Sequence, residues 1–436
     1  MTIYRVQPED TLPQIAQRFG VAVDIIATIN GLNVADPLVI GMELVIPTIT
    51  ASVSALKHIV GPFDSLWSIA GSYRVTMSQL IWLNKLYYPY ILYPGQRLII
   101  SQHSVTAFQE KPTIETLGYY DPAADPNKPA LIDELGGYLT YIGLFEFPIT
   151  ETGEIIGEID PEVLAAANRN AAALLPVLTN LREGSFDPDL ARTVLANPAL
   201  LNNLINSIMA LLQSYDLSGV IIDFENLYPE DRDLFTSFIR LLSERLHSED
   251  KLLVLNLAAK WEEWAEKQWV GFFDYNALGP LIDIAAIMTY EWGYREGPPD
   301  PTAPLPFVRT TLDYAIANNI PANKILMGMT LYGYDWELPD TPENLAETIT
   351  LPEVWNIGRE YGSTILYDEE VQQPYMTYTT AEGIAHEIWF ENARSHYSKY
   401  QLVIEYGLRG VFYWIIHMPF PSTWYMVSQL FNIRKL

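Results

Sequence analysis

Cysteine is absent from this chain of 436 residues. Its absence excludes disulfide bonds, thiolate metal sites and a cysteine nucleophile. Basic residues are scarce as well, because 26 Lys and Arg stand against 53 Asp and Glu and leave a net charge of -27. Nucleic-acid binding depends on clustered Lys and Arg, so we exclude a nucleic-acid partner.

Long apolar segments and metal-binding motifs are also missing. The longest apolar stretches, such as residues 411–416, fall far short of the roughly 18 residues that a membrane-spanning helix needs. The first residues lack the basic and apolar segments of a secretory signal peptide, so we expect synthesis in the cytoplasm. The His residues show no H-x-x-x-H or H-E-x-x-H spacing, and no P-loop is present. We therefore expect neither a metal nor a cofactor.

Aromatic residues are abundant, with 27 Tyr and 11 Trp. This exceeds what packing alone usually needs and is typical of many enzymes that bind sugars. The apolar fraction of 49% is ample for a buried core. The length exceeds one ordinary domain of about 150 residues, which favours one large unit with smaller ones.

The first hundred residues contain an internal duplication. A shift of 54 residues aligns Ile3–Ile46 with Lys57–Ile100 without a gap. The apolar spacing of each copy predicts a short strand, two helices and a short strand. Asp10 and Asp64 lie where we expect the N-cap of the first helix in each copy.

Both copies resemble the LysM module. The resemblance rests on Tyr4-x-Val6, Asp10-Thr11-Leu12, Asn30-Gly31-Leu32 and Gly41-x-x-Leu44 in the first copy, and on their equivalents in the second. It implies LysM domains at residues 1–48 and 56–102 that bind polymers containing N-acetylglucosamine, such as peptidoglycan or chitin. The second copy has Lys85 in place of Gly31 and carries Tyr87-Tyr88-Pro89-Tyr90, so we expect a different binding surface there.

Small and polar residues predict linkers at 48–56 and 101–115. Because such linkers usually separate independent domains, we expect few contacts across the second one. A protein that lacks residues 1 to about 105 should then keep its remaining domain folded.

The rest of the chain, residues 112–436, has the pattern of a (β/α)8 TIM barrel, an α/β fold. Helical segments such as Asp231–Leu246 alternate with short apolar runs that predict strands. The eight runs are Thr116–Tyr120, Leu139–Phe145, Leu174–Thr179, Gly219–Phe224, Leu252–Leu257, Ile282–Tyr290, Ile325–Leu331 and Gly410–Trp414. Residues of about 337–406 exceed one crossover helix, so we expect a small α+β insertion between strands seven and eight.

Two carboxylates, Asp223 and Glu225, end the fourth run. Their spacing points both side chains to one face of a strand, and barrel enzymes carry their chemistry at these strand ends. When two carboxylates lie close together in a partly dry site, their pKa values move apart. One of them then stays protonated near neutral pH and can act as a general acid. The alternative is that both merely cap the next helix or form an ion pair.

The strand ends resemble glycoside hydrolase family 18. The segment Gly219-Val220-Ile221-Ile222-Asp223-Phe224-Glu225-Asn226 is similar to the family's fourth-strand motif, although Ser218 and Ile221 occupy its first two acidic positions. Four further strands agree, at Gly118-Tyr119-Tyr120, Met288-Thr289-Tyr290-Glu291-Trp292, Leu331-Tyr332-Gly333-Tyr334-Asp335-Trp336 and Gly410-Val411-Phe412-Tyr413-Trp414. The whole chain resembles the spore-cortex-lytic N-acetylglucosaminidases of spore-forming bacteria.

The resemblance implies a role for each matching residue. Glu225 would be the general acid and then the base, Asp223 would orient the 2-acetamido group of the substrate, and Tyr290 would donate a hydrogen bond to it. The acetamido oxygen would attack the anomeric carbon, so that the configuration is retained and no second carboxylate is needed. The expected substrate-binding residues are Trp414, Tyr332, Glu291, Asn226, Tyr119 and Phe145. Glu146, His417 and Asp335 could also face the cleft.

The predicted function is hydrolysis of β-1,4 bonds next to N-acetylglucosamine in peptidoglycan, with spore cortex as the expected substrate. A chitinase is one alternative. A catalytically inactive glycan-binding protein of the spore coat is another, although the presence of Glu225, Asp223 and Tyr290 disfavours it. We expect a monomer in the spore coat, cortex or cell wall.

Overall fold

The computed structural model describes residues 1–48, 54–73, 75, 77–86, 90–102, 111–125, 128–341 and 344–436. Most of the two predicted linkers and the Tyr87-Tyr88-Pro89 run lie outside the described residues.

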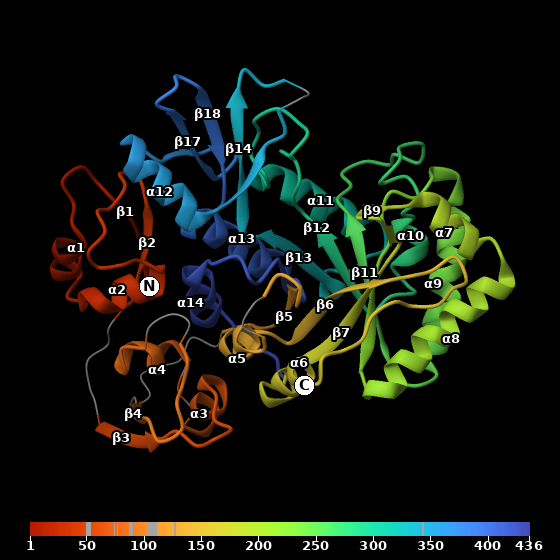
Figure 1. Cartoon of the computed structure of the whole chain (residues 1–436), viewed down its shortest axis with the longest axis horizontal. Coiled ribbons are helices and arrows are strands. Elements are labelled where there is room, and N and C mark those ends of the chain that lie inside the picture. The colour runs from red at the N-terminus through yellow and green to blue at the C-terminus, as the bar shows by residue number, and fades with distance from the viewer. Residues whose placement is uncertain are drawn as a thin grey trace.

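The two N-terminal repeats each fold as strand, helix, helix and strand, as the sequence predicts (Figure 1). In each repeat the two strands pair antiparallel. The first repeat contains β1 (Thr2–Arg5), α1 (Leu12–Phe19), α2 (Val23–Asn30) and β2 (Glu43–Ile46), and the second contains β3 (Ser54–Ile59), α3 (Leu66–Tyr73), α4 (Met77–Leu83) and β4 (Arg97–Gln102).

Asp10 does not cap α1, so this prediction is wrong. Thr11 is the N-cap, and its hydroxyl accepts a hydrogen bond from the backbone of Gln14. The Asp10 carboxylate instead accepts hydrogen bonds from the Tyr4 hydroxyl at 2.6 Å and from the Gln7 backbone at 2.8 Å. Asp10 therefore stabilises the loop before α1 and does not cap the helix.

Asp64 has the same place in the second repeat, and the same prediction is wrong there. Because α3 begins at Leu66, the residue that precedes it is Ser65. Asp64 accepts a hydrogen bond from the Gly61 backbone at 2.6 Å and pairs with His58 at 2.8 Å.

The remaining chain forms a closed barrel of eight parallel strands, and the fold prediction is confirmed. Hydrogen bonds between β19 and β5 close the sheet. The strands follow the eight predicted apolar runs within a few residues and are almost entirely buried. In chain order they are β5 (Thr113–Tyr120), β6 (Tyr141–Pro148), β7 (Ala173–Thr179), β10 (Gly219–Asp223), β11 (Leu252–Ala258), β12 (Ile284–Met288), β13 (Ile325–Thr330) and β19 (Gly410–Trp414).

Helices cover the outside of the barrel (Figure 1). Several begin where a proline follows a capping side chain, as at Asp160, Asp187 and Asn197, because proline suits the first helical position and the cap satisfies a free backbone N–H. These helices are α5 (Ala130–Leu135), α6 (Pro161–Arg169), α7 (Pro188–Leu195), α8 (Pro198–Tyr215), α9 (Arg232–His247), α10 (Tyr275–Leu278), α11 (Leu305–Ala317), α13 (Ala393–Tyr406) and α14 (Pro421–Leu430). Short strands β8 (Leu181–Arg182), β9 (Ser185–Phe186) and β20 (Asn432–Ile433) complete this part.

An α+β insertion lies between β13 and β19, as predicted. It is an antiparallel five-stranded sheet in the order β15, β14, β18, β17 and β16, with one helix packed against it. Its elements are β14 (Tyr332–Leu338), β15 (Glu347–Thr350), α12 (Leu351–Tyr361), β16 (Leu366–Asp368), β17 (Gln373–Thr379) and β18 (Ala385–Trp389). The inserted sheet begins at Tyr332 because β14 follows β13 almost directly, and α13 is the crossover helix that leads to β19.

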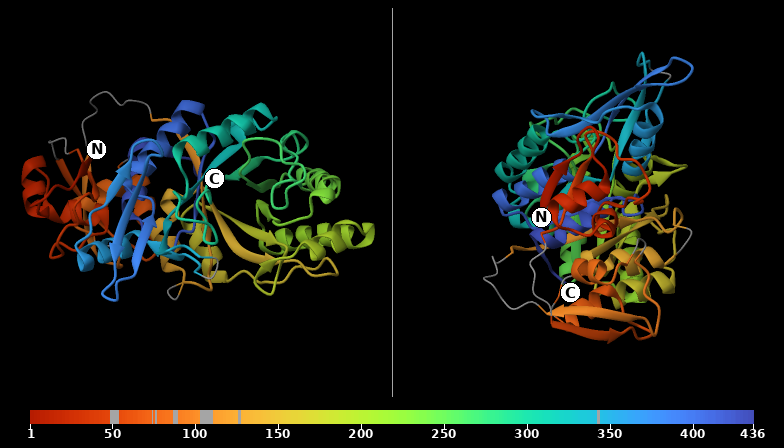
Figure 2. Two further views of the ribbon diagram at one scale, coloured as in Figure 1. Left: turned by 90° about the horizontal axis from the view of Figure 1, so that it is seen from above. Right: turned by 90° about the vertical axis from the view of Figure 1, so that its left-hand side faces the viewer.

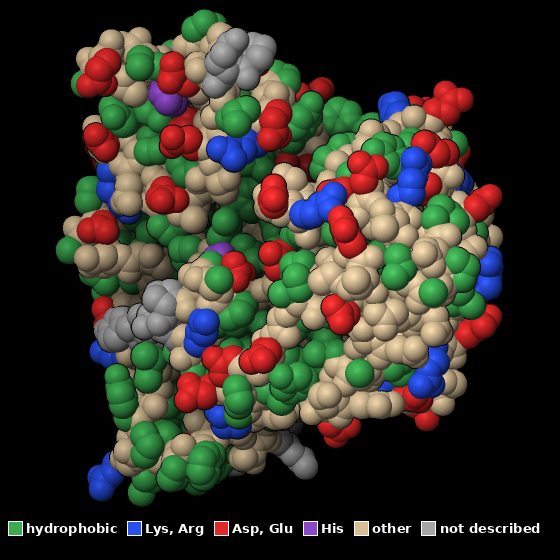
Figure 3. All heavy atoms as spheres, turned by 45° about the vertical axis from the view of Figure 1, so that its right-hand side comes forward, with side chains coloured by type: hydrophobic (Ala, Val, Ile, Leu, Met, Phe, Trp, Pro, Cys, Tyr) green, Lys and Arg blue, Asp and Glu red, His purple; other side chains and the backbone are tan. Residues whose placement is uncertain are grey.

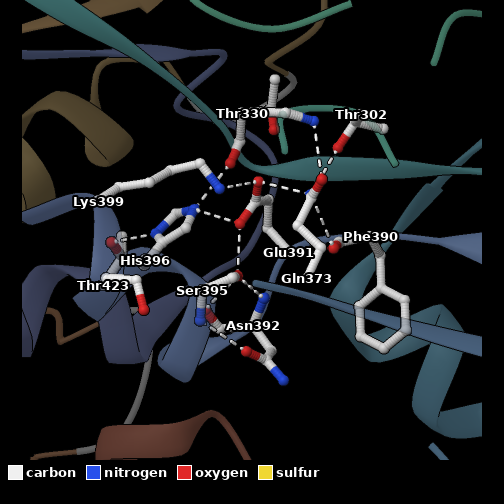
Figure 4. A network of polar contacts seen from close by, with 12 residues as sticks. Thr302, Thr330, Gln373, Phe390, Glu391, Asn392, Ser395, His396, Lys399 and Thr423 are labelled. Carbon is white, nitrogen blue, oxygen red and sulfur yellow. Dashed lines mark hydrogen bonds and ion pairs between the residues drawn. The ribbon is translucent and has the colours of Figure 1, made fainter. Parts of the chain in front are cut away.

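A buried polar network joins the base of the insertion to the barrel (Figure 4). Glu391 accepts hydrogen bonds from Lys399 at 2.7 Å and from Gln373 at 2.8 Å. His396 contacts the carbonyl oxygen of Thr330, at the end of β13, at 3.0 Å. Burial lowers the pKa of His396 to about 3, so that this imidazole is neutral. The network satisfies polar groups that would otherwise be costly to bury.

The first repeat packs against the insertion and the barrel, so the expectation of few contacts across the linker is wrong. Figures 1 and 2 show this repeat beside α12 and α14. The Arg5 guanidinium donates to the Ile365 carbonyl at 3.1 Å, and the Arg359 guanidinium donates to the Pro37 carbonyl at 3.0 Å. These partners lie more than three hundred residues apart in the chain, so the composition of the linker cannot predict that they meet.

Acidic side chains outnumber basic ones on the face that Figure 3 shows, in keeping with the net charge. In the part of the chain that the structure describes, no single helix is long and apolar enough to span a membrane. The pair α7 and α8 meets these criteria of length and composition only when taken together, and it is bent by 100°.

Candidate active site

A cavity opens among the carboxyl ends of the barrel strands, where barrel enzymes carry out their chemistry. Eight of the nine site residues expected from the sequence line it. The lining residues are Tyr119, Phe145, Glu146, Leu181, Gly184, Phe186, Asp223, Glu225, Asn256, Met288, Tyr290, Glu291, Tyr332 and Trp414. The set contains four carboxylates and no Lys or Arg.

Asp223 ends β10, and Glu225 lies just beyond the strand. Asn180, which follows β7, fixes the backbone at Glu225 from both sides. The Glu225 N–H donates to the side-chain oxygen of Asn180 at 2.9 Å, and the Asn180 amide donates to the Glu225 carbonyl at 3.0 Å. The position of the Glu225 backbone is therefore set by two neighbouring strands.

The surroundings of the two carboxyls separate their proton affinities. Burial raises the pKa of Glu225 well above its ordinary value, and the charges of Asp223 and Glu291 raise it further. Burial also raises the pKa of Asp223, to about 6, although a hydrogen bond from Asn256 opposes this rise. Because the ionisation of one carboxyl opposes the ionisation of its neighbour, Glu225 has the higher proton affinity of the pair.

Asn256, in β11, connects two walls of the cavity. Its side-chain amide donates to Asp223 Oδ1 at 2.9 Å, and its oxygen accepts a hydrogen bond from the Tyr119 hydroxyl. This chain of hydrogen bonds holds the Asp223 carboxylate in one orientation.

Aromatic side chains form another part of the cavity lining. The Trp414 ring lies edge-on to Tyr119 and Phe145, with centroid distances of 5.4 and 5.2 Å. Tyr290 is buried, and its hydroxyl has no hydrogen-bond partner among the described residues. This hydroxyl is therefore available to a bound molecule.

Glu291 sits at the rim of the cavity and is held by the insertion. Its Oε1 atom accepts hydrogen bonds from the hydroxyls of Tyr332 and Tyr334, the latter at 2.9 Å. Both tyrosines belong to β14. The insertion thus supplies part of one wall of the cavity.

Asn226 does not line the cavity, unlike the other expected site residues. Its amide donates to the Phe186 carbonyl at 3.0 Å, and its side-chain oxygen accepts from Gln268 at 2.9 Å. Asn226 thereby supports the short strand β9, which carries the lining residue Phe186. Asp335 and His417, which could have faced the cleft, lie outside the lining as well, whereas Glu146 is part of it.

Sequence reasoning missed Asn180 and Asn256. Asn180 directly follows a predicted apolar run, and Asn256 lies inside another. A single polar residue at such a place is a signal for a functional role. However, the sequence alone does not distinguish it from an ordinary capping residue. Among the described residues, no group of three or more His, Asp or Glu side chains is arranged to hold a metal ion.

Comparison with known proteins agrees with this geometry. The model of the glycosyl hydrolases family 18 matches residues 190–418, and that of the LysM domain matches residues 4–47 and 58–101. The chain is 33% identical to the cortical fragment-lytic enzyme of Bacillus subtilis, over 100% of this chain and 99% of that protein.

Two solved structures are similar as well. One is the Bacillus cereus spore cortex-lytic enzyme SleL, with a TM-score of 0.81, 32% identity and coverage of 100% of this chain and 99% of that one. The other is a chitinase from Chromobacterium violaceum, with a TM-score of 0.67, 25% identity and coverage of 72% of this chain and 98% of that one. The chain therefore belongs to the family 18 glycosyl hydrolases and is a glycosidase that carries two LysM domains at its N-terminus.

Proposed function

We propose that this glycosidase hydrolyses β-1,4 bonds next to N-acetylglucosamine in peptidoglycan, and that spore cortex is its substrate. The observation that carries the chemistry is the position of Asp223 and Glu225 in the cavity at the end of β10, where burial raises the pKa of both carboxyls and that of Glu225 the more. The relatives named for cortex lysis support the choice of polymer.

Glu225 acts as the general acid on the leaving oxygen and then as the base on the incoming water. A carboxyl that stays protonated near neutral pH suits the first step. The fixed backbone at Glu225 keeps the acid in one place during both steps, and such positioning contributes directly to the rate.

The acetamido group of the substrate acts as the nucleophile. Asp223, held by Asn256, orients the acetamido N–H and stabilises the positive charge that develops on this group. The unpartnered Tyr290 hydroxyl donates to the acetamido oxygen. Trp414 provides an apolar floor for the sugar ring, and Tyr119, Phe145, Tyr332 and Glu291 form the walls. Because the nucleophile belongs to the substrate, the product keeps its anomeric configuration.

Glu146 is the carboxylate that offers a rival nucleophile. It lines the same cavity, and burial, together with the charge of Asp121, raises its pKa. A protein nucleophile would remove the need for the acetamido group, so the substitution of Glu146 separates the two mechanisms.

The LysM domains bring the enzyme to its polymer. We assign them to residues 1–48 and 56–102, and the catalytic domain, with its insertion, to residues 112–436. Two linked weak binding modules raise the local concentration of the enzyme at an insoluble glycan. We place the enzyme in the spore, at the coat and cortex or the cell wall. The monomeric state expected from the sequence stays a prediction.

One experiment tests the choice of substrate. The same enzyme preparation is incubated with spore cortex, with vegetative peptidoglycan and with chitin, and the products are identified by mass spectrometry. We expect fragments from cortex that end in N-acetylglucosamine. Faster release of chitin oligomers than of cortex fragments would make the enzyme a chitinase, which the similarity to a bacterial chitinase keeps as the second candidate.

A further inference from the structure

Equivalent glycines of the two repeats have the same backbone conformation but different surroundings. Gly41 has a φ of 86° and Gly95 a φ of 87°. A Cβ atom on Gly41 would lie 2.0 Å from the Ile365 carbonyl oxygen, whereas a Cβ atom on Gly95 would meet nothing within 4 Å. The first repeat thus contacts the insertion at Gly41, whereas no described residue lies close to the place that a side chain at the equivalent Gly95 of the second repeat would take.

Other equivalent positions differ in the same way. Val39 is 3% exposed and packs against Gly358 of α12, whereas its counterpart Tyr93 is 65% exposed. Gly31 and its counterpart Lys85 both have a left-handed φ. A Cβ atom on Gly31 would lie 2.8 Å from the Pro421 side chain. This close approach accounts for glycine in the first repeat where the second tolerates lysine.

Polar contacts reinforce this interface. The Ile365 N–H donates to the Ile40 carbonyl at 2.9 Å, and the Ile365 carbonyl accepts from Arg5. Arg359 of α12 donates to the Pro37 carbonyl. The segment from α12 to β16 is therefore bonded to the first repeat through both backbone and side-chain groups.

The same segment leads directly to the catalytic cavity. Thr350, the N-cap of α12, is the register partner of Tyr332 in β14. Tyr332 lines the cavity and donates a hydrogen bond to Glu291. One helix and one strand pairing thus separate the first repeat from the wall of the active site.

We propose that the first repeat is a brace for the catalytic domain. It holds α12 and β14 in place, and through them it positions Tyr332 and Glu291 against the bound sugar. The repeat then contributes to turnover of a soluble glycan that is too short to reach from a LysM domain to the cavity. This role is additional to polymer binding, and it rests on the proposed hydrolysis of N-acetylglucosamine glycans.

Gly41→Ala and Gly95→Ala form a matched pair that tests the brace. Both place alanine at the same left-handed φ and so carry the same backbone strain, but only the first creates a clash with the insertion. The assays are kcat and KM on a soluble N-acetylglucosamine oligosaccharide, and amide hydrogen exchange of the full chain.

We expect Gly41→Ala to lower kcat/KM by about tenfold or more, since a misplacement of about 1 Å at a site can cost about a hundredfold. The loss should appear mainly in KM, because Asp223 ends β10 and Glu225 lies just beyond it, and β10 lies three strands from β13 in the barrel order. Exchange should accelerate in α12 and β14 but not in α9. Gly95→Ala should match the parent protein in all three measurements.

Arg359→Ala provides a second variant that introduces no clash. It removes the hydrogen bond to Pro37, and we expect a smaller change in KM and exchange in the same direction. Arg240→Ala, at an exposed position of α9, is its control.

Equal turnover and equal exchange for the two glycine variants would overturn the brace. So would faster exchange in α12 and β14 with unchanged KM, because the insertion would then loosen without effect on the site. Failure of the parent to cleave the oligosaccharide would contradict the proposed function instead. In that case hydrogen exchange, which needs no substrate, still decides whether the repeat holds the insertion.

Discussion

Replacement of Asp223 by asparagine should make the protein more stable and less active. In the folded protein, burial raises the pKa of Asp223 from 3.8 to about 6. An ionised Asp223 therefore costs the folded state about 3 kcal/mol relative to the unfolded chain. Asparagine keeps the oxygen that accepts from Asn256 and never ionises, so the variant escapes this cost.

The gain in stability should depend on pH in a defined direction. Below pH 3.8 the carboxyl is neutral in both states and the cost is absent. As the pH rises, the unfolded chain ionises first, so the cost builds up and is complete above a pH of about 6. A poorly satisfied amide would have an effect that is independent of pH and cancels from the comparison. Loss of the Asp223 charge also lowers the Glu225 pKa, and this second effect adds to the gain in stability at high pH.

Denaturant unfolding of parent and variant at pH 4 and at pH 8 measures this difference. We expect the stability of the variant relative to the parent to rise by about 3 kcal/mol or more between the two pH values. Cleavage should slow by about 10²–10³-fold, as when one group that stabilises a developing charge is removed. The alkaline limb of the rate profile, where Glu225 loses the proton that it must donate, should move to lower pH, because the charge of Asp223 raises the Glu225 pKa in the parent. A relative stability that is equal at both pH values would refute the electrostatic reasoning.

Three other substitutions test the assigned roles. Glu225→Gln should lower kcat by about 10²–10⁴-fold, because the amide cannot deliver a proton, with an unchanged circular dichroism spectrum and intact glycan binding; activity within a few-fold of the parent would mean that another residue is the acid. Tyr290→Phe should slow cleavage by about tenfold or more through loss of the donor to the acetamido oxygen, and unchanged steady-state kinetics would remove Tyr290 from the site. Glu146→Gln should lower kcat by no more than about a few-fold, since a nucleophile supplied by the substrate needs no second carboxylate; a loss as large as that of Glu225→Gln would identify Glu146 as the nucleophile.

The barrel could be predicted because its strands are buried on both faces. Each strand therefore reads as a short apolar run, and the polar residues that end these runs stand out, as Asp223, Glu225 and Tyr290 do. The same logic cannot identify Asn180 and Asn256, whose importance comes from partners on neighbouring strands. A hydrogen bond between strands depends on register, which a single sequence does not reveal.

Other errors have a similar physical origin. Asp10 and Thr11 are adjacent and both can cap a helix, and the choice between them depends on Tyr4 and Gln7, which take the Asp10 carboxylate. The interface of the first repeat involves residues such as Gly41 and Ile365. A glycine of left-handed φ is expected in a turn of either repeat, so its second role, to allow close approach, shows only in three dimensions.

The configuration of the first product tests the central claim most directly. Proton NMR during the first minutes of hydrolysis of an N-acetylglucosamine oligosaccharide distinguishes the two anomers before they interconvert. A mechanism in which Glu225 supplies the proton and the acetamido group attacks the anomeric carbon predicts the β-anomer, with no cleavage of the de-N-acetylated substrate. An initial α-anomer, or equal cleavage of the de-N-acetylated substrate, would contradict it.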